Sequence, residues 1–416
     1  MGREFRKLDR EFLDEVVVLE TESYPAGGHS EEDKLRIRRS IGEIMDRQDD
    51  VRAYYGLIEQ GQLLAQMCLL TFDLNCRGQM IRAGGVGSVA TALVHRKQGA
   101  ARDLLRAGLL YYRNINVSMV TLYPFRFGFY RKMGFGYGAE VRRYRVDPAH
   151  FPDRRVPGVL RRYRGSESER EALLACYQTS LRKTHGMISR LNPSMEEAFR
   201  SELAPVVYER QGRVEGYLVV DFERHYVMKN NLVVREWVYN TPEALYALAS
   251  FLHHQVDQFE KIVLETQDPA LAMILTDVDA GTYEAFQSQF VESHTSATGI
   301  LYRVVDLPAL FAAMGSWAIA GPDLAVKLVI SDDFLPEHQS TTVVVVENGQ
   351  FRVGSEQPID VELRTDVATF SSLWMGAIDI DSAIRLGLVH VSSIEPLPGL
   401  RALFRVDAKP QCWQHF

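Results

Sequence analysis

VGSVATALV (residues 86–94) runs without a break into HRKQGAAR (95–102) and then into DLLRAGLL (103–110), and this segment organises the rest of the chain. The first part is rich in small and β-branched residues, which is typical of a strand. The last part has apolar residues three and four positions apart, which is the period of a helix. The segment therefore predicts a strand, a tight basic turn and a helix.

The turn has the composition of an anion site. Its small residues leave backbone N–H groups uncovered, and the helix that starts there adds the positive end of its dipole. Arg96, Lys97 and Arg102 supply positive charge. A pyrophosphate is the ligand that this arrangement favours, and an ordinary solvated helix start is the alternative.

The spacing Arg96-x-x-Gly99-x-Ala101 is similar to the acetyl-CoA loop of the GNAT acetyltransferases. A second element follows, in which a predicted strand at 118–123 leads into FGFYRKMGFGYG (127–138) and resembles the Tyr-x-x-x-Gly-Phe element of that family. In the family this element places a tyrosine beside the CoA thiol, and Tyr130 is the matching residue. Both elements occur in the family's order and at a suitable separation, so together they predict a GNAT fold.

The composition is that of an ordinary globular protein, with 46% hydrophobic and 24% charged residues. A length of 416 residues predicts two or three domains. The net charge of −7 offers no basic excess for nucleic acid, and it suits a cationic amine. The four cysteines form no C-x-x-C pair, so neither a zinc site nor a disulfide framework is expected. No leader or membrane-spanning segment is recognised, which favours a cytoplasmic protein without a membrane partner.

Helical and strand patterns divide the chain into three parts, of which residues 1–147 are the predicted catalytic GNAT domain. Ser30 opens a capping box, so it is expected to start a helix. The expected helices are 9–24 and 30–46, and the expected strands ahead of the 84–138 segment are 51–58 and 63–74.

Residues 148–300 repeat this pattern in outline. Ser168 and Ser194 are expected to cap helices. The turn Asn240-Thr241-Pro242-Glu243 has no glycine and no basic residue, and it puts a carboxylate where a phosphate would lie. This part is therefore predicted to be a second GNAT-like domain without a CoA site. Its expected helices are 168–184 and 241–259, and its expected strands are 206–210, 214–222 and 232–239.

Residues 301–416 predict an α+β layer of strands followed by helices. Asn348-Gly349 is the pair that a two-residue type I′ hairpin requires. No residue of this part carries obvious chemistry. The expected strands are 325–330, 341–347, 350–353 and 359–363, and the expected helices start at 307, 366, 382 and near 400.

The whole chain resembles the bacterial "enhanced intracellular survival" (Eis) acetyltransferases. The resemblance implies an α/β (α+β) chain of two tandem GNAT domains and a C-terminal sterol carrier protein-like domain. It also implies a hexamer that uses acetyl-CoA as co-substrate, needs no metal, and acetylates a small aminoglycoside- or polyamine-like amine, or a lysine, by direct attack on the thioester. In that family the terminal α-carboxylate, here that of Phe416, is the general base, and a tyrosine matching Tyr130 is the general acid.

The same resemblance implies the CoA contacts. The backbone of β-strand residues 89–91 would follow the pantetheine arm, and the basic turn would hold the pyrophosphate. The family's Ser-Glu pair ahead of the tyrosine is replaced by Phe125-Arg126. The implied CoA contacts are Val89, Ala90, Thr91, Arg96, Lys97, Gln98, Gly99, Ala100, Ala101, Arg102, Phe125 and Arg126.

Two other classes of function stay open at this point. The chain could be a lipid or acyl-CoA binding protein that uses an apolar tunnel in its C-terminal domain, or a silent assembly protein that keeps the fold. Tyr130, in an aromatic cluster with Phe127, Phe129 and Phe135, would then be ordinary core. Turnover of acetyl-CoA distinguishes these alternatives from the enzyme.

Overall fold

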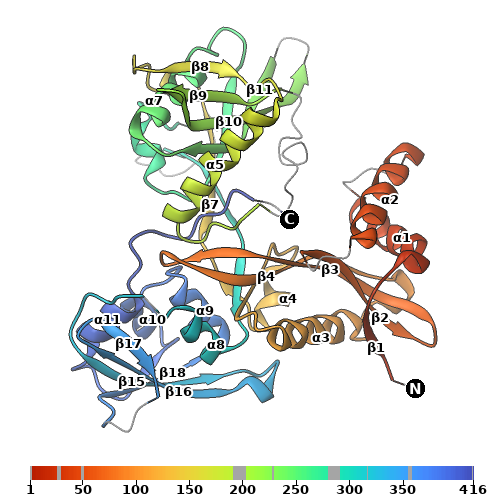
Figure 1. Cartoon of the computed structure of the whole chain (residues 1–416), viewed down its shortest axis with the longest axis vertical. Helices are drawn as coiled ribbons and strands as arrows, with labels where there is room; N and C mark the ends of the chain where they lie inside the picture. Colours follow the sequence, from red (N-terminus) through yellow and green to blue (C-terminus); the bar gives the residue numbers. More distant parts are fainter. Residues whose placement is uncertain are drawn as a thin grey trace. The chain divides into compact units, whose positions relative to one another are not determined.

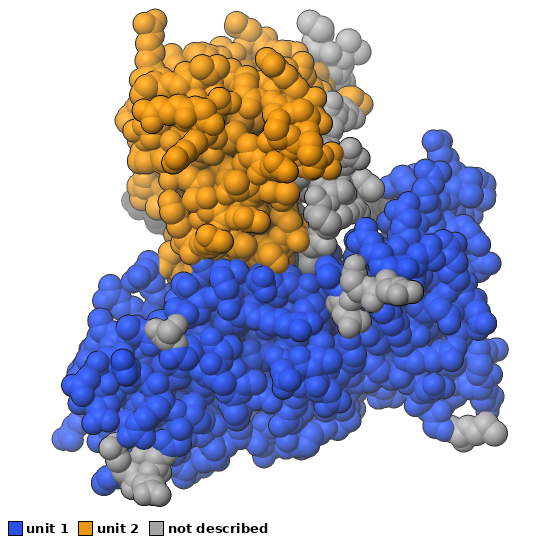
Figure 2. Space-filling model, viewed as in Figure 1, with its two compact units in different colours: residues 1–138, 300–407, 416 blue, residues 139–299, 408–415 orange. Residues whose placement is uncertain are grey.

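The computed structural model describes residues 2–25, 30–47, 51–190, 203–226, 229–279, 291–315, 317–354, 358–414 and 416. The chain forms two compact units, coloured separately in Figure 2. Unit 1 contains Met1–Gly138, Ile300–Asp407 and Phe416, and unit 2 contains Ala139–Gly299 and Ala408–His415. The expected capping box at Ser194 lies outside the described residues.

The first sheet of unit 1 has seven strands in the order β1-β2-β3-β4-β5-β14-β6. Strands β1 to β4 of this sheet are labelled in Figure 1. All neighbours are antiparallel except β4 and β5, which are parallel. The strands are β1 (Glu4–Lys7), β2 (Arg52–Glu59), β3 (Gln62–Cys76), β4 (Gln79–Thr91), β5 (Met119–Leu122), β6 (Gly136–Tyr137) and β14 (Leu301–Val304).

Helices cover both faces of this sheet. On one face α3 (Ala100–Asn114) packs its apolar stripe on Met67, Leu69 and their neighbours to form the main core. On the other face α1 (Leu13–Ser23) and α2 (Glu31–Asp46) lie against β2, β3 and β4. Ser30 caps α2 by accepting the Asp33 N–H, which confirms the expected capping box.

The second sheet of unit 1 has five strands in the order β17-β16-β15-β18-β19. Asn348 and Gly349 join β16 to β17 with φ angles of 52° and 78°, as the type I′ turn requires. The strands are β15 (Leu324–Ser331), β16 (Ser340–Glu347), β17 (Gln350–Val353), β18 (Val361–Asp366) and β19 (His390–Val391), and the helices are α8 (Leu307–Ala313), α9 (Val367–Trp374), α10 (Ile380–Arg385) and α11 (Leu397–Phe404).

Arg77 joins the first sheet of unit 1 to helices α9 and α11. It lies in the turn between β3 and β4, and its guanidinium donates to the carbonyls of Trp374 at 2.8 Å and Leu403 at 2.7 Å. The same group lies 4.2 Å from the centroid of the Trp374 ring. Burial lowers the pKa of Arg77 to about 10, and the carbonyl acceptors provide the partners that a buried cation needs.

Unit 2 has one seven-stranded sheet in the order β13-β7-β12-β11-β10-β9-β8. Ser166 caps α5 (Glu167–Lys183), two residues before the expected Ser168. Thr241 caps α7 (Pro242–His253) as expected. Helix α7 ends before the expected residue 259. The strands are β7 (Glu140–Val146), β8 (Val159–Arg162), β9 (Val206–Arg210), β10 (Arg213–Tyr226), β11 (Lys229–Tyr239), β12 (Lys261–Thr266) and β13 (Thr295–Thr298).

The two seven-stranded sheets exchange strands along the chain. Strand β14 follows the residues of unit 2 but pairs with β5 and β6 in unit 1. Strand β7 follows β6 but pairs with β12 and β13 in unit 2. The units therefore change at Gly138–Ala139 and Gly299–Ile300, so the expected boundary after residue 147 falls beyond β7. No local pattern in the sequence marks this exchange.

Candidate active site

β4 separates from β5 halfway along its length. The parallel pairing runs from Ala83↔Met119 to Val86↔Leu122, while β4 continues to Thr91. In the described part of the chain, residues 87–91 therefore have β3 on one side and no strand on the other. The expected pantetheine contacts at 89–91 lie in this half, where no described strand pairs with the second edge of β4.

A β-bulge interrupts β4 at the start of this open half. Ser88 has a φ of 48°, and the pairing with β3 shifts between Gln66 and Cys68. A bulge changes where side chains point, and bulges are common next to active sites. A serine with positive φ is strained, and such strain concentrates at functional positions.

The turn after β4 has the geometry of an anion site. Lys97 and Gly99 have φ angles of 66° and 85°, and Gly99 is the N-cap of α3 with no side-chain hydrogen bond. Left-handed residues followed by a helix start aim consecutive N–H groups at one point. A Cβ at Gly99 would have only Arg3 Nη1 near it, at 3.9 Å, so space above the turn is open. Arg96, Lys97, Gln98 and Arg102 are exposed around it, while Ala100 is buried.

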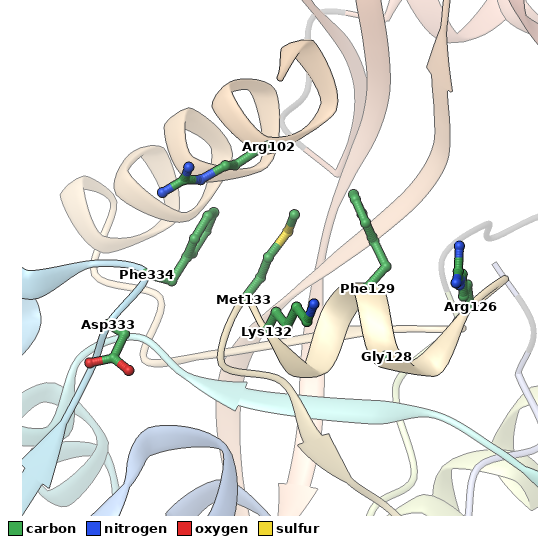
Figure 3. Close-up of a pocket in the computed structure, with 8 residues that line it drawn as sticks. All are labelled: Arg102, Arg126, Gly128, Phe129, Lys132, Met133, Asp333 and Phe334. Carbon is green, nitrogen blue, oxygen red and sulfur yellow. The ribbon is translucent and has the colours of Figure 1, made fainter. Parts of the chain in front are cut away.

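A pocket of about 500 Å³ lies beside this turn in unit 1 (Figure 3). Phe129 and Met133 of the α4 region and Phe334 point toward α3, which contributes Arg102. Its other lining residues are Arg126, Gly128, Lys132 and Asp333. Three cations against one carboxylate make the pocket suited to an anionic ligand with an apolar ring. No sequence motif marks Lys132 or Phe334 as a ligand contact, so neither residue was expected at this pocket.

Tyr130 lies on α4 (Phe127–Arg131), within 5.1–6.0 Å of three phenylalanine rings, measured between centroids. These rings belong to Phe125, Phe129 and Phe135. Only 3% of Tyr130 is exposed, and its hydroxyl forms no hydrogen bond within the described residues. Burial raises the pKa of Tyr130, and the nearby Tyr24 phenol raises it further. Tyr24 donates to the carbonyl of Val89 at 3.0 Å, so both phenols lie at the open half of β4.

Phe416 ends the chain beside the glycines of β4. Its ring contacts Phe72 and Tyr123, with centroid separations of 5.5 and 5.4 Å. Its carboxyl carbon lies 3.6 Å from the position that a Cβ would occupy on Gly87, and a Cβ on Gly85 would lie 2.9 Å from its ring. The missing side chains of these glycines therefore make the space that holds the terminal residue against the sheet.

Glu20 is a further carboxylate at this site that no sequence motif marks. It lies on α1 and accepts hydrogen bonds from Ser88 Oγ at 3.1 Å and Gln66 Nε2 at 3.2 Å. Burial raises the pKa of Glu20, although both hydrogen bonds oppose the shift. The one available signal was a single glutamate on the otherwise apolar face of α1, next to Val16, Val17 and Leu19.

The equivalent half-open region of unit 2 is filled. Strand β11 pairs with β12 only from Asn231 to Val234 and continues to Tyr239. There the Glu236 carboxylate accepts hydrogen bonds from Arg190 at 2.5 Å and Tyr217 at 2.6 Å, all of them buried. The fully buried Trp237 occupies the other face of β11.

The sequence matches three family models. Residues 4–138 match an acetyltransferase (GNAT) domain, residues 183–297 match a second acetyltransferase (GNAT) domain model, and residues 307–413 match a sterol carrier protein domain. The chain is therefore an acetyltransferase with two GNAT domains and a C-terminal sterol carrier protein domain. This confirms the expected fold class and enzyme class.

Solved structures share this fold over the whole chain. A GCN5-related N-acetyltransferase from Anabaena variabilis ATCC 29413 has a TM-score of 0.83 at 17% identity, and a probable N-acyltransferase from Enterococcus faecalis V583 has 0.78 at 18%; each comparison covers 100% of both chains. Eis1 from Mycobacterium abscessus has 0.75 at 20% identity, again with 100% of both chains covered. At these identities the likeness concerns the fold alone.

No curated protein matches the sequence. Among the described residues, no helix has the length and apolar character needed to span a membrane. Within the same residues, no group of three or more His, Cys, Asp or Glu side chains is placed to hold a metal ion.

Proposed function

We propose that this chain is an acetyl-CoA-dependent N-acetyltransferase of the Eis type that acetylates amino groups of small cationic amines. The observation that carries the proposal is the open half of β4. There the separation from β5, the basic turn at Gly99 and the terminal carboxyl of Phe416 occur within one unit. This arrangement supplies a place for the thioester, a place for its phosphates, and a carboxylate beside the reacting end.

CoA would lie along β4 in an extended conformation. The backbone of Val89 to Thr91 would pair with the pantetheine amides where β5 no longer does. The pyrophosphate would accept hydrogen bonds from the N–H groups at 98–102 and the positive end of α3. Arg96 and Lys97 are exposed at this turn, and they would neutralise the phosphates.

The basic pocket of Figure 3 fits the remaining part of CoA, its phosphorylated adenosine. Arg102, Arg126 and Lys132 are three cations suited to the 3′-phosphate, and Phe129 and Phe334 offer rings for the adenine. Phe125, 68% exposed, contacts Phe129 and Tyr130, so it would cover the pantetheine arm near the thiol.

The chemistry needs a nucleophilic nitrogen and a protonated leaving group. The amine attacks the carbonyl carbon, the C–S bond breaks, and the sulfur leaves with the electron pair. Tyr130 gives its proton to that thiolate, a contribution of about 10²–10⁴ in rate. Burial raises the pKa of Tyr130, and it also raises that of a thiol in the same apolar surroundings, so both groups shift in the same direction. The Phe416 carboxylate accepts a proton from the nitrogen and places negative charge beside the developing ammonium.

The acceptor is proposed to be a small amine that carries a positive charge. Two carboxylates lie beside β4. That of Glu20 accepts the Ser88 hydroxyl, and that of Phe416 lies next to Gly87. The net charge of the chain, −7, also favours a cationic substrate. Aminoglycosides, polyamines and the lysine side chain all meet this requirement.

A turnover assay tests this proposal. Release of free CoA thiol from acetyl-CoA would be followed with a panel of a polyamine, an aminoglycoside, a lysine peptide and a neutral alcohol as the control acceptor. We expect thiol release with at least one amine and none with the alcohol. Absence of turnover with every amine, by a protein that binds acetyl-CoA, would remove the proposal.

Lipid or acyl-CoA binding by the C-terminal domain is the second candidate, because residues 307–413 match a sterol carrier protein domain. The interior of that domain is occupied by aromatic side chains. Phe370 and Trp374 are fully buried and stacked 6.0 Å apart, and Phe311 contacts Trp374 at 5.4 Å. This packing favours a structural role for the domain, and a fluorescent fatty acid titration would test for a lipid site.

The resemblance to Eis acetyltransferases extends the proposal to a cytoplasmic homo-hexamer. Light scattering coupled to size-exclusion chromatography would measure the assembly directly. A single species of one chain mass, 47.2 kDa, would contradict it.

A further inference from the structure

Glu20 lies on the same face of the first sheet as the terminal carboxyl group. Alternate residues of β3 point to opposite faces. Met67 contacts Gly108 of α3, whereas Gln66 donates to Glu20 of α1. The Cβ position of Gly87 points to Leu70 Cδ1 at 3.7 Å and to the carboxyl carbon of Phe416 at 3.6 Å, so Phe416 lies on the face of Gln66 and Leu70.

The two carboxylates contact neighbouring residues at the bulge of β4. Glu20 accepts the Ser88 hydroxyl, and the carboxyl of Phe416 stands beside Gly87. Consecutive Cα atoms are about 3.8 Å apart, so both acids flank the point where β4 and β5 separate. An acetyl group delivered along β4 would meet both of them.

The groups that face Glu20 come from every element around it. Arg52 of β2 and the hydrogen bonds from Ser88 and Gln66 lower the pKa of Glu20, while burial raises it and is the largest effect. Tyr24 lies one helical turn further along α1, and the negative charge of Glu20 raises the pKa of Tyr24 and of Tyr54. Cys68 is fully buried nearby and protonated, because burial raises the pKa of its thiol. Glu20 is thus the carboxylate of this cluster, and burial is the largest effect on its pKa.

We propose that the Glu20 carboxylate, fixed by Ser88 and Gln66 at the β4 bulge, binds the ammonium group of the acceptor and removes its first proton. This rests on the proposed acetyltransferase function. The nitrogen loses two protons during the whole reaction. The first passes to Glu20 and frees the lone pair that attacks the thioester, and the second leaves the tetrahedral intermediate for the Phe416 carboxylate. Tyr130 supplies one proton to the departing thiolate. One of the two protons taken up by Glu20 and Phe416 reprotonates Tyr130, and the other is released to solvent in each cycle.

The test is Glu20→Gln, assayed with two kinds of acceptor in the full-length protein. With an alkylamine, which is protonated at pH 7, kcat/KM is expected to fall about 10²–10⁴-fold. With an alkoxyamine, which is uncharged at pH 7, it is expected to fall less than about tenfold. Glu15→Gln is the matched control, because Glu15 is on the same helix and accepts the Leu63 N–H at 3.2 Å on the sheet. Equal losses with both acceptors, or no loss with either, would overturn the proposal.

The pH profile gives an independent readout. For the wild type, kcat/KM with the alkylamine is expected to rise with pH through the raised pKa of Glu20, and this limb should be absent in Glu20→Gln. Glu20→Asp, which keeps a shorter carboxylate, should retain the limb at a lower rate, and it replaces the glutamine variant if that protein does not bind acetyl-CoA. A limb that persists in Glu20→Gln would assign the proton to another group.

Folding stability separates this role from a structural one. The folded-state pKa of Glu20 is raised, so the folded chain binds the proton more tightly than the unfolded chain, and stability falls as pH rises through that pKa. The Tm of Glu20→Gln at pH 8 is therefore expected to equal or exceed that of the wild type. A Tm loss that accompanies the loss of activity would contradict the proposal. An inactive wild type would instead remove the proposed function.

Discussion

The turn after β4 and the turn after β11 occupy the same place in two similar sheets, yet they differ in what fills them. In unit 1 the turn has Gly99 in a left-handed conformation with open space above it and exposed cations around it. In unit 2 the Thr241 hydroxyl accepts the Ala244 N–H, and Glu243 pairs with Arg210 at 3.1 Å. The second turn uses the Thr241 hydroxyl to bind one of its N–H groups and carries a carboxylate, which disfavours a phosphate.

The strands ahead of these turns differ in the same way. In β4, Gly85 and Gly87 face Phe416, and the open half carries Ser88 at its bulge. The open half of β11 carries the buried pair of Arg190 and Glu236 and the fully buried Trp237. One GNAT-type scaffold thus has an open strand half with small residues in unit 1, and a packed core with large residues in unit 2.

Gly99→Glu should have the largest effect. A side chain at a φ of 85° is strained, and its carboxylate would stand at the proposed pyrophosphate site. Loss of two charge-assisted hydrogen bonds, about 1.5–3 kcal/mol each, weakens acetyl-CoA binding about 10²–10⁴-fold. Isothermal titration would measure the Kd, and the wild type should bind one CoA per chain.

Gly99→Asn is the control, because asparagine tolerates left-handed φ angles and adds no charge. We expect it to lose much less affinity. A wild-type titration with two CoA molecules per chain would show that the turn after β11 also binds, and it would remove the contrast between the two units.

Tyr130→Phe should lower kcat about 10²–10⁴-fold and leave the Kd of acetyl-CoA nearly unchanged. The hydroxyl makes no hydrogen bond within the described residues, so its removal costs little packing. Phe127, on the same short helix and stacked on Tyr137 at 3.9 Å, gives a comparison. Phe127→Leu should change stability more than kcat. Wild-type turnover by Tyr130→Phe would show that Tyr130 has only a packing role.

One glycine added after Phe416 should reduce kcat roughly 10²-fold. The extension moves the carboxylate by about 3.8 Å from its position beside Gly87. Gly85→Ala should act in the same direction, since its Cβ would lie 2.9 Å from the Phe416 ring. An N-terminal tag serves as the control, and full activity with a C-terminal tag would place the second base elsewhere.

Glu236→Gln in unit 2 should have the smallest effect on catalysis. It leaves the Arg190 guanidinium buried without its carboxylate, which costs about 3–5 kcal/mol of folding free energy. Urea unfolding would measure this loss, while the Kd of acetyl-CoA and kcat at low temperature should not change. A change in acetyl-CoA affinity of the folded variant would mean that unit 2 contributes to the site.

Capping and turn chemistry explain most of the elements that could be predicted. Ser30, Thr241 and the Asn348-Gly349 pair each act through atoms only a few residues away, and each lies where expected. The prediction that Ser168 caps a helix was wrong, because Ser166 is the N-cap and also has a glutamate three residues later. That residue, Glu169, accepts the Arg164 N–H at 2.8 Å, and this contact favours the earlier helix start.

The sequence by itself determined the basic turn, the aromatic helix of Tyr130 and the three-part order of the chain, because these depend on periodicity and on local backbone chemistry. Only the tertiary structure decided that β14 enters the first sheet, that β7 enters the second, and that Glu20 lies against Ser88. Strand partners and side-chain neighbours far apart in the chain are selected by the packing of whole faces. The sequence of a short segment therefore does not specify its distant strand partners.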